Sequence, residues 1–237
     1  MVISFARFGI VMTMLSGVTM SAYSTEDYDD AYYAKVQTIA VLPKETADPK
    51  ATPPVPPYFQ MQVARGYLSS RVTQYTSFEF DALYPTMEHF SRSRIEAWYT
   101  KTPIGRWGPH VKDVLRIFVE YRVTGENDEG AVFLNSLTQH KKKDIDLVTP
   151  PTELLQKIPT LHIYQNPKNT LDRHYVFRQP DGRTVVVMCG LGCTGRTTWK
   201  GKLKLHYIFP EVRFSEMAEI DTAVNKLIDS FQPIQIK

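Results

Sequence analysis

Residues 174–188 read HYVFRQPDGRTVVVM, and this segment decides how the C-terminal part of the chain folds. Two runs rich in β-branched and aromatic residues, 174–178 and 183–188, flank the turn sequence Gln-Pro-Asp-Gly at 179–182. A Pro-Asp-Gly turn between two such runs is typical of antiparallel strands joined by a tight connection. The segment therefore predicts a β-hairpin.

Downstream of the hairpin, residues 200–209 alternate between apolar and polar side chains. One face would carry Leu203, Leu205, Tyr207 and Phe209, and the other Lys202, Lys204 and His206. Alternation of this kind indicates an antiparallel strand with one buried face. We expect a meander of three strands.

An amphipathic helix is expected at residues 215–231, with Ser215 as its N-cap and Glu216 and Glu219 in its first turns. Its apolar stripe consists of Met217, Ile220, Val224, Leu227, Ile228 and Phe231. Strands followed by a packing helix form an α+β unit.

The part of the chain before this unit also favours strands. We expect strands at residues 36–42, 59–67, 77–84 and 114–123. Helices are expected at residues 85–99 and 153–157. Residues 125–130 are expected to form a charged turn, and the pattern at 133–146 is ambiguous. Six prolines make residues 43–57 an extended loop. The predicted class is α+β, with mainly antiparallel sheets and packing helices. We divide the chain into a leader, an N-terminal α+β region (25–150) and a C-terminal meander with its helix (151–237).

The first 24 residues have the features of a secretory signal peptide. Arg7 is their only charge, an apolar run follows it, and Ala22-Tyr23-Ser24 offers a small-x-small cleavage site. The run is short and broken by small polar residues, which disfavours a membrane span. No cysteine follows that would suggest a lipid anchor, and a buried N-terminal helix is the alternative. We expect a cleaved leader, a periplasmic location and no stable membrane anchor.

The chain has two cysteines, Cys189 and Cys193, in the sequence C-G-L-G-C. In an oxidising compartment two nearby thiols usually pair, and the intervening glycines permit a tight turn. We expect a disulfide that fixes this turn, with free thiols as the alternative.

Charge and motifs exclude several function classes. Cleavage after residue 24 removes Arg7 and lowers the formal net charge from +3 to +2, too near neutral to indicate nucleic acid as the partner. Gly190-x4-Gly195-Arg196-Thr197 imitates a phosphate-binding loop, but the residues after it read as a strand instead of the required helix. No Gly-x-Ser-x-Gly or His-Glu-x-x-His occurs, and the six histidines are scattered. We predict no catalytic residues, no metal site and no cofactor.

Two surface patches are candidates for a partner interface. Arg106 and Trp107 belong to a segment rich in arginine and aromatic residues, the composition of protein-binding hot spots. Lys202, Lys204 and His206 form a basic stripe on the predicted exposed strand face. An ordinary solvated face is the alternative interpretation of both.

The order of features resembles that of a known family. After the leader, a strand and a proline-rich loop come Leu83-Tyr84-Pro85-Thr86-Met87, a strand ending Tyr207-Ile208-Phe209-Pro210, and a helix with Ile220-Asp221 and Ile228-Asp229-Ser230-Phe231. This order resembles periplasmic immunity proteins, which neutralise lipase or phospholipase toxins of type VI secretion systems. The resemblance implies a stoichiometric inhibitor of a cognate toxin, with no catalysis of its own.

Two other classes stay open at this point. One is a periplasmic enzyme whose catalytic residues are scattered along the chain. The other is an envelope binding or scaffold protein. A polar cleft with perturbed carboxylates would favour the enzyme, and a large apolar cavity would favour lipid binding.

Overall fold

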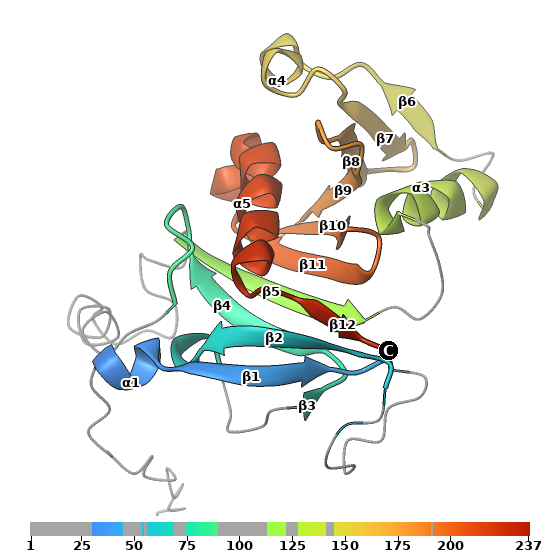
Figure 1. Cartoon of the computed structure of the whole chain (residues 1–237). Coiled ribbons are helices and arrows are strands. Elements are labelled where there is room, and N and C mark those ends of the chain that lie inside the picture. The colour runs from blue at the N-terminus through green and yellow to red at the C-terminus, as the bar shows by residue number, and fades with distance from the viewer. Residues whose placement is uncertain are drawn as a thin grey trace, which may run out of the picture.

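The computed structural model describes residues 30–44, 54, 56–68, 74–89, 113–121, 128–140, 145–190 and 192–237. The predicted leader, most of the proline-rich loop and residues 90–112 lie outside these described residues. Two β-sheets and helix α5 dominate the described part (Figure 1).

The larger sheet has eight strands, and every neighbouring pair in it is antiparallel. In spatial order the strands are β4 (Phe78–Leu83), β5 (Val114–Tyr121), β11 (Leu203–Phe209), β10 (Cys193–Trp199), β9 (Thr184–Cys189), β8 (Asn169–Arg178), β7 (His162–Asn166) and β6 (Asp146–Val148). The expected hairpin is confirmed as β8–β9, with Gly182 in its turn at a φ of 89°.

The smaller sheet has four strands. In spatial order these are β12 (Ile234–Ile236), β2 (Tyr58–Ala64), β1 (Val36–Val41) and β3 (Gln74–Tyr75), with β1 and β3 parallel and the other pairs antiparallel. A short 3-10 helix, η1 (Arg65–Tyr67), follows β2. This sheet lies beside β4 and β5 of the larger one (Figure 1).

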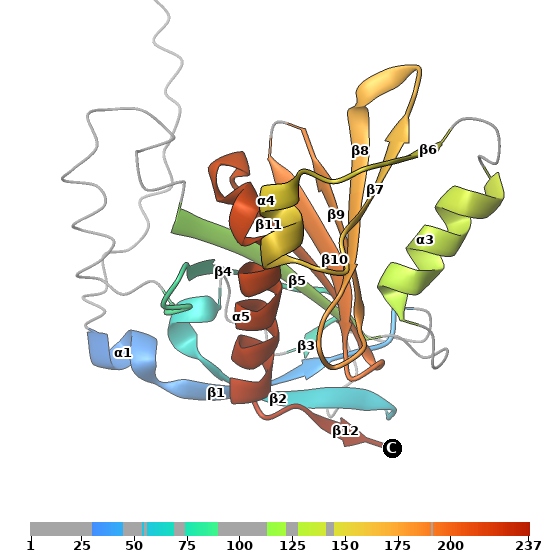
Figure 2. The ribbon, with the colours of Figure 1, turned by 90° about the horizontal axis from the view of Figure 1, so that it is seen from above.

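The helices of the described residues are α1 (Asp30–Ala34), α3 (Glu129–His140), α4 (Thr152–Lys157) and α5 (Met217–Ser230), and the 3-10 helix η3 (Glu211–Glu216) lies directly before α5. Figure 2 shows α5 and α3 on opposite sides of strands β8–β10. Gly130 of α3 lies against the backbone of Thr184 in β9, where a side chain would not fit. The middle of the larger sheet is therefore covered on both faces.

One hydrophobic core joins the two sheets and α5. The predicted apolar stripe of α5 is buried, and Phe231 packs its ring against Tyr67 and Phe80 at centroid distances of 5.2 and 5.5 Å. Phe59 of the smaller sheet meets Tyr121 of the larger one at 5.0 Å. The α+β class with mainly antiparallel sheets is confirmed.

Several boundaries differ from the sequence prediction. The strand expected at 200–209 begins at Leu203, because Lys200 and Gly201 adopt positive φ (48° and 68°) in the turn that joins β10 to β11. Strand β10 was missed as an element of its own, so the expected meander is part of a longer sheet. Ser215 does not cap α5, because η3 precedes the helix and Glu216 occupies the N-cap position.

Two upstream segments also differ from the prediction. Residues 85–89 form a turn closed by a bridge between Leu83 and Glu88, so no helix begins at Pro85. Gly130, expected in a turn, lies in α3. The boundary drawn at residue 150 falls between β6 and α4, and strands from both regions are neighbours in one sheet; the division stays a prediction.

Candidate protein-binding groove

A groove of about 730 Å³, open to solvent, runs beside α5. Helix α5 forms one wall, the turn after β4 forms the other, and Gln179 from the β8–β9 turn contributes to the lining. The lining residues are Pro85, Thr86, Met87, Gln179, Ala218, Glu219, Thr222, Ala223, Lys226, Leu227 and Ser230. The groove is the candidate functional site.

The α5 wall combines small side chains with two charges. Thr222 and Ala223 keep the middle of this wall low, Ala218 lies at its start, and Glu219 and Lys226 are exposed along it. Seven residues separate the two charges, so both lie on the same side of the helix. Neither forms an ion pair with another described residue.

The opposite wall is held in an unusual backbone conformation. Met87 has a φ of 57°, the left-handed region that side chains other than glycine rarely adopt. The Tyr67 hydroxyl donates a buried hydrogen bond of 2.5 Å to the Met87 carbonyl, and the Met87 amide donates to the Leu83 carbonyl at 2.6 Å. Such conformations persist where the surroundings fix them, and they cluster at functional sites.

A polar cluster fixes this turn relative to the start of α5. Arg213 of η3 donates to Asp113 at 2.6 Å and to Glu216 at 3.0 Å, and its guanidinium lies 5.4 Å from the centre of the Tyr84 ring. Burial raises the pKa of Tyr84, and its hydrogen bond to Glu216 raises it further. Both walls of the groove are thereby joined to η3.

Beneath α5 lies a buried carboxylate, Asp221, which faces the sheet. Its Oδ2 lies 3.2 Å from Arg183 Nη1 and accepts from Gln179 Nε2 at 2.9 Å, while its Oδ1 accepts from the Tyr207 hydroxyl at 3.1 Å. Burial raises the pKa of Asp221, although Arg183, Gln179 and Tyr207 oppose that shift. Gln179 also donates to the Ala218 carbonyl at 3.0 Å. This network attaches α5 to the β8–β9 hairpin.

Sequence reasoning placed Asp221 in the helix motif but predicted neither its burial nor its pairing with Arg183. A signal for Asp221 was available, because it lies four residues after Met217 and three before Val224, on the apolar stripe of the helix. A charged residue on such a stripe indicates a buried, paired carboxylate. Its partner Arg183 could not be identified from spacing along the chain.

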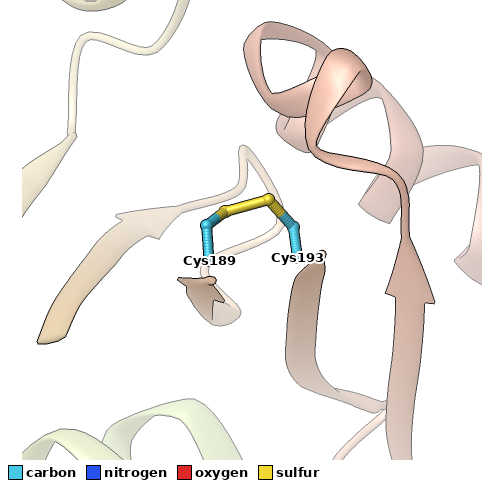
Figure 3. Close-up of a disulfide and its surroundings, with 2 residues drawn as sticks. All are labelled: Cys189 and Cys193. Atoms are coloured by element: carbon cyan, nitrogen blue, oxygen red, sulfur yellow. A yellow bond between two sulfur atoms is a disulfide. The ribbon is translucent and has the colours of Figure 1, made fainter. Parts of the chain in front are cut away.

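Cys189 and Cys193 form the predicted disulfide (Figure 3). Their Cα atoms are 4.1 Å apart and they face each other across β9 and β10, where the Gly190 amide donates to the Gly192 carbonyl at 2.9 Å. The cross-link closes one end of this strand pair. Gly195–Thr197 lie within β10, so the imitation of a phosphate-binding loop has no following helix.

The predicted basic stripe lies away from the groove, and its two lysines have polar partners. Lys204 lies 3.7 Å from Glu120, and Lys202 donates to Gln235 at 3.1 Å. The His206 ring stacks on Phe118 at a centroid distance of 5.1 Å. Burial lowers the pKa of His206, and Arg196 and Lys204 lower it further. Arg106 and Trp107, the other predicted interface residues, lie outside the described residues.

Within the described ranges, no group of three or more His, Cys, Asp or Glu side chains is arranged to hold a metal ion. Of the helices described, none has the length and apolar character needed to cross a membrane.

Comparison with known proteins finds similarity at the level of structure. No protein-family model and no curated protein sequence matches the chain. The structure is similar to that of Smlt3025, an immunity protein of the Stenotrophomonas maltophilia type IV secretion system, with 13% identity and a TM-score of 0.48 over 76% of this chain and 90% of that one. It is also similar to FrpD, an iron-regulated outer membrane lipoprotein of Neisseria meningitidis, with 12% identity and a TM-score of 0.46 over 86% and 94%. With TM-scores below 0.5, neither similarity carries a functional argument.

Proposed function

We propose that this chain is an exported immunity protein that binds and inhibits a lipid-hydrolysing toxin in the periplasm, without catalysis of its own. The toxin would be a lipase or phospholipase effector of a type VI secretion system, as the sequence resemblance implies. The groove beside α5 would receive a segment of the toxin.

The proposal rests on the position of the sequence motifs that resemble those of periplasmic immunity proteins. Pro85-Thr86-Met87 forms one wall of the groove, and Ser230 lies in the other. Asp221 fixes the second wall from beneath, and Phe231 packs on the Tyr67 ring behind the first. Segments more than 130 residues apart in the sequence thus build the same feature.

The groove is suited to tight binding because both of its walls are fixed in advance. Trp199 Nε1 donates to Asp229 at 2.9 Å and ties the end of α5 to β10. Asp221 ties the first half of the helix to Arg183, directly before β9, and to Tyr207 of β11. Preorganised surfaces lose less conformational entropy on binding. An inhibitor that must inactivate nearly every toxin molecule needs a nanomolar dissociation constant. This corresponds to a binding free energy of about 12 kcal/mol in favour of the complex.

The position of Asp221 favours a binding role over catalysis. A catalytic carboxylate with a raised pKa would have to reach a bound substrate. Asp221 has no exposed surface, points toward the sheet and has its oxygens occupied by Arg183, Gln179 and Tyr207. Its raised pKa follows from burial beneath the helix.

The proposal is tested by calorimetric titration of the purified mature chain with the lipase and phospholipase effectors encoded in the same genome. We expect one effector to bind at a 1:1 ratio with a nanomolar dissociation constant and to lose its lipase activity. Thr222→Trp, which fills the groove, should weaken binding at least a hundredfold. Thr152→Trp on exposed α4 is the matched control and should bind as the wild type. Failure of every effector to bind would refute the proposal.

A further inference from the structure

We infer that the groove accepts an α-helical segment of the partner that carries one basic and one acidic side chain seven residues apart. This inference rests on the proposed function and specifies which part of the toxin enters the groove. Two charges, the shape of the wall between them and the geometry of peptide segments support it.

The first support is the pair of charges on α5. Glu219 and Lys226 line the groove, are exposed and form no ion pair with any described residue. Their separation of seven residues corresponds to about 10.5 Å along the helix axis at 1.5 Å per residue. A complementary partner therefore presents a base beside Glu219 and an acid beside Lys226, about two helical turns apart.

The second support is that this separation suits a helix and disfavours a strand. In a strand, about 10.5 Å corresponds to three residues at roughly 3.3 Å each. Residues three apart in a strand point to opposite faces, so strand residues at this spacing do not both face the groove. On a helix, residues seven apart lie on one side. Two helices side by side can therefore satisfy both charges at once, as paired helices do along a coiled coil.

The third support is the low middle of the α5 wall. Between the charges the wall consists of Thr222 and Ala223, with Ala218 one residue before Glu219. The axes of two packed helices usually lie about 8–10 Å apart, and small side chains at the contact allow a distance in the lower part of this range. A parallel partner helix would carry Lys or Arg seven residues before Asp or Glu, and an antiparallel one would carry them in the reverse order.

The charges are exposed, so they should act mainly on the association rate and on partner choice. Exchanging them places like charges opposite each other while the net charge of the chain stays the same. We expect Glu219→Lys combined with Lys226→Glu to slow association at least tenfold at low salt. The difference should shrink as salt rises, because exposed charges are screened.

The experiment measures association and dissociation rates of the effector that the wild-type chain neutralises, at two salt concentrations. The matched control exchanges another exposed pair, Glu153→Lys with Lys157→Glu on α4. In a parallel selection, effector variants that escape the wild-type chain are sequenced. We expect escape substitutions at two charged positions seven residues apart on one helix of the effector, and we expect reversal of those charges to restore binding to the exchanged chain.

The outcomes separate this inference from the proposed function. If the wild-type chain binds an effector but the exchanged chain binds it equally well, or escape substitutions fall only in strands or loops, the inference is wrong and the immunity function stands. If no effector binds the wild-type chain, both fail. If sedimentation shows that the chain self-associates and that only the groove exchange abolishes this, the occupant is a second copy and the inference is overturned.

Discussion

Arg183 Nη1 lies 3.2 Å from Asp221 Oδ2, and this ion pair joins α5 to the residue directly before β9. The Asp221 side chain is fully buried, and only 15% of the Arg183 side chain is exposed. Arg183 also contacts Asp181 at 2.6 Å, so one guanidinium links the hairpin turn to the helix. The α5 wall of the groove depends on this link.

Replacing Arg183 with methionine should therefore destabilise the protein strongly. The substitution keeps an unbranched stem like the aliphatic part of arginine but leaves Asp221 buried without its cation, which costs about 3–5 kcal/mol. The free energy of unfolding, measured by urea titration, should fall by this amount. Arg173→Met, on an exposed position of β8, is the control and should change it by less than about 1 kcal/mol. Equal stabilities of the two variants would contradict the structural role of the pair.

Gly195 offers a second test of the α5 side of the sheet. It lies opposite Tyr207 in the register of β10 and β11, and a Cβ atom at position 195 would overlap the Tyr207 ring. Gly195→Ala should therefore cost about 1–3 kcal/mol by forcing Tyr207 from its place, which also disturbs its hydrogen bond to Asp221.

Gly190→Ala is the matched control for this substitution. Nothing lies within 4 Å of a Cβ at Gly190. Its thermal unfolding midpoint should stay close to that of the wild type while that of Gly195→Ala falls. If Gly195→Ala is as stable as Gly190→Ala, the Tyr207 ring does not pack closely on Gly195, and the prediction is wrong.

The fold could be predicted where local patterns decide it. The strand expected at 77–84, the Pro-Asp-Gly turn and the apolar stripe of α5 agree with the structure. Burial of one face makes apolar residues recur every two positions in a strand and about every 3.6 in a helix, so these elements can be predicted from local patterns. The start of β11 was misplaced, because a non-glycine residue, Lys200, adopts the turn conformation. The helix expected from Pro85 failed in its described part, since spacing cannot reveal a turn held by Tyr67 from another element.

The candidate site was less predictable, because its parts meet only in the folded chain. The prediction of a basic stripe at Lys202, Lys204 and His206 did not include its acceptors, because these lie on other strands. Glu120 of β5 pairs with Lys204, and Gln235 of β12 accepts from Lys202. The groove walls belong to segments more than 130 residues apart. Nothing along the chain joins Met87 to Lys226, so the two walls could not be assigned to one groove from sequence alone.

His206 should make the stability of the protein depend on pH. Burial, Arg196 and Lys204 lower its pKa in the folded state, so the unfolded chain binds the proton more readily. Stability from the neutral ring is then fully present above the unfolded pKa of about 6.5 and is lost as the pH falls through the folded pKa.

The measurement is the unfolding free energy of the wild type minus that of His206→Gln, followed from pH 8 to pH 5. This difference should be constant above about pH 7. Below about pH 6.5 it should fall, because the wild type loses the stability of the neutral ring and the variant has no such stability to lose. A difference that stays constant from pH 8 to pH 5 would refute the assignment.

Export and oxidation can be checked together by mass spectrometry. The mature protein from periplasm should begin between residues 22 and 25, because the leader ends in Ala22-Tyr23-Ser24. It should also be two hydrogens, about 2 Da, lighter than its reduced form, because Cys189 and Cys193 are joined. An intact Met1 would refute cleavage, and ready labelling of both thiols by maleimide would refute the disulfide.

The central claim is that this chain protects a cell by binding a toxin. The most direct measurement is the survival of cells whose periplasm receives the lipid-hydrolysing effector, with and without periplasmic copies of the chain. Immunity predicts survival with the wild-type chain and with Thr152→Trp, and killing with Thr222→Trp expressed at the same level. Equal killing with and without the wild-type chain would contradict the account.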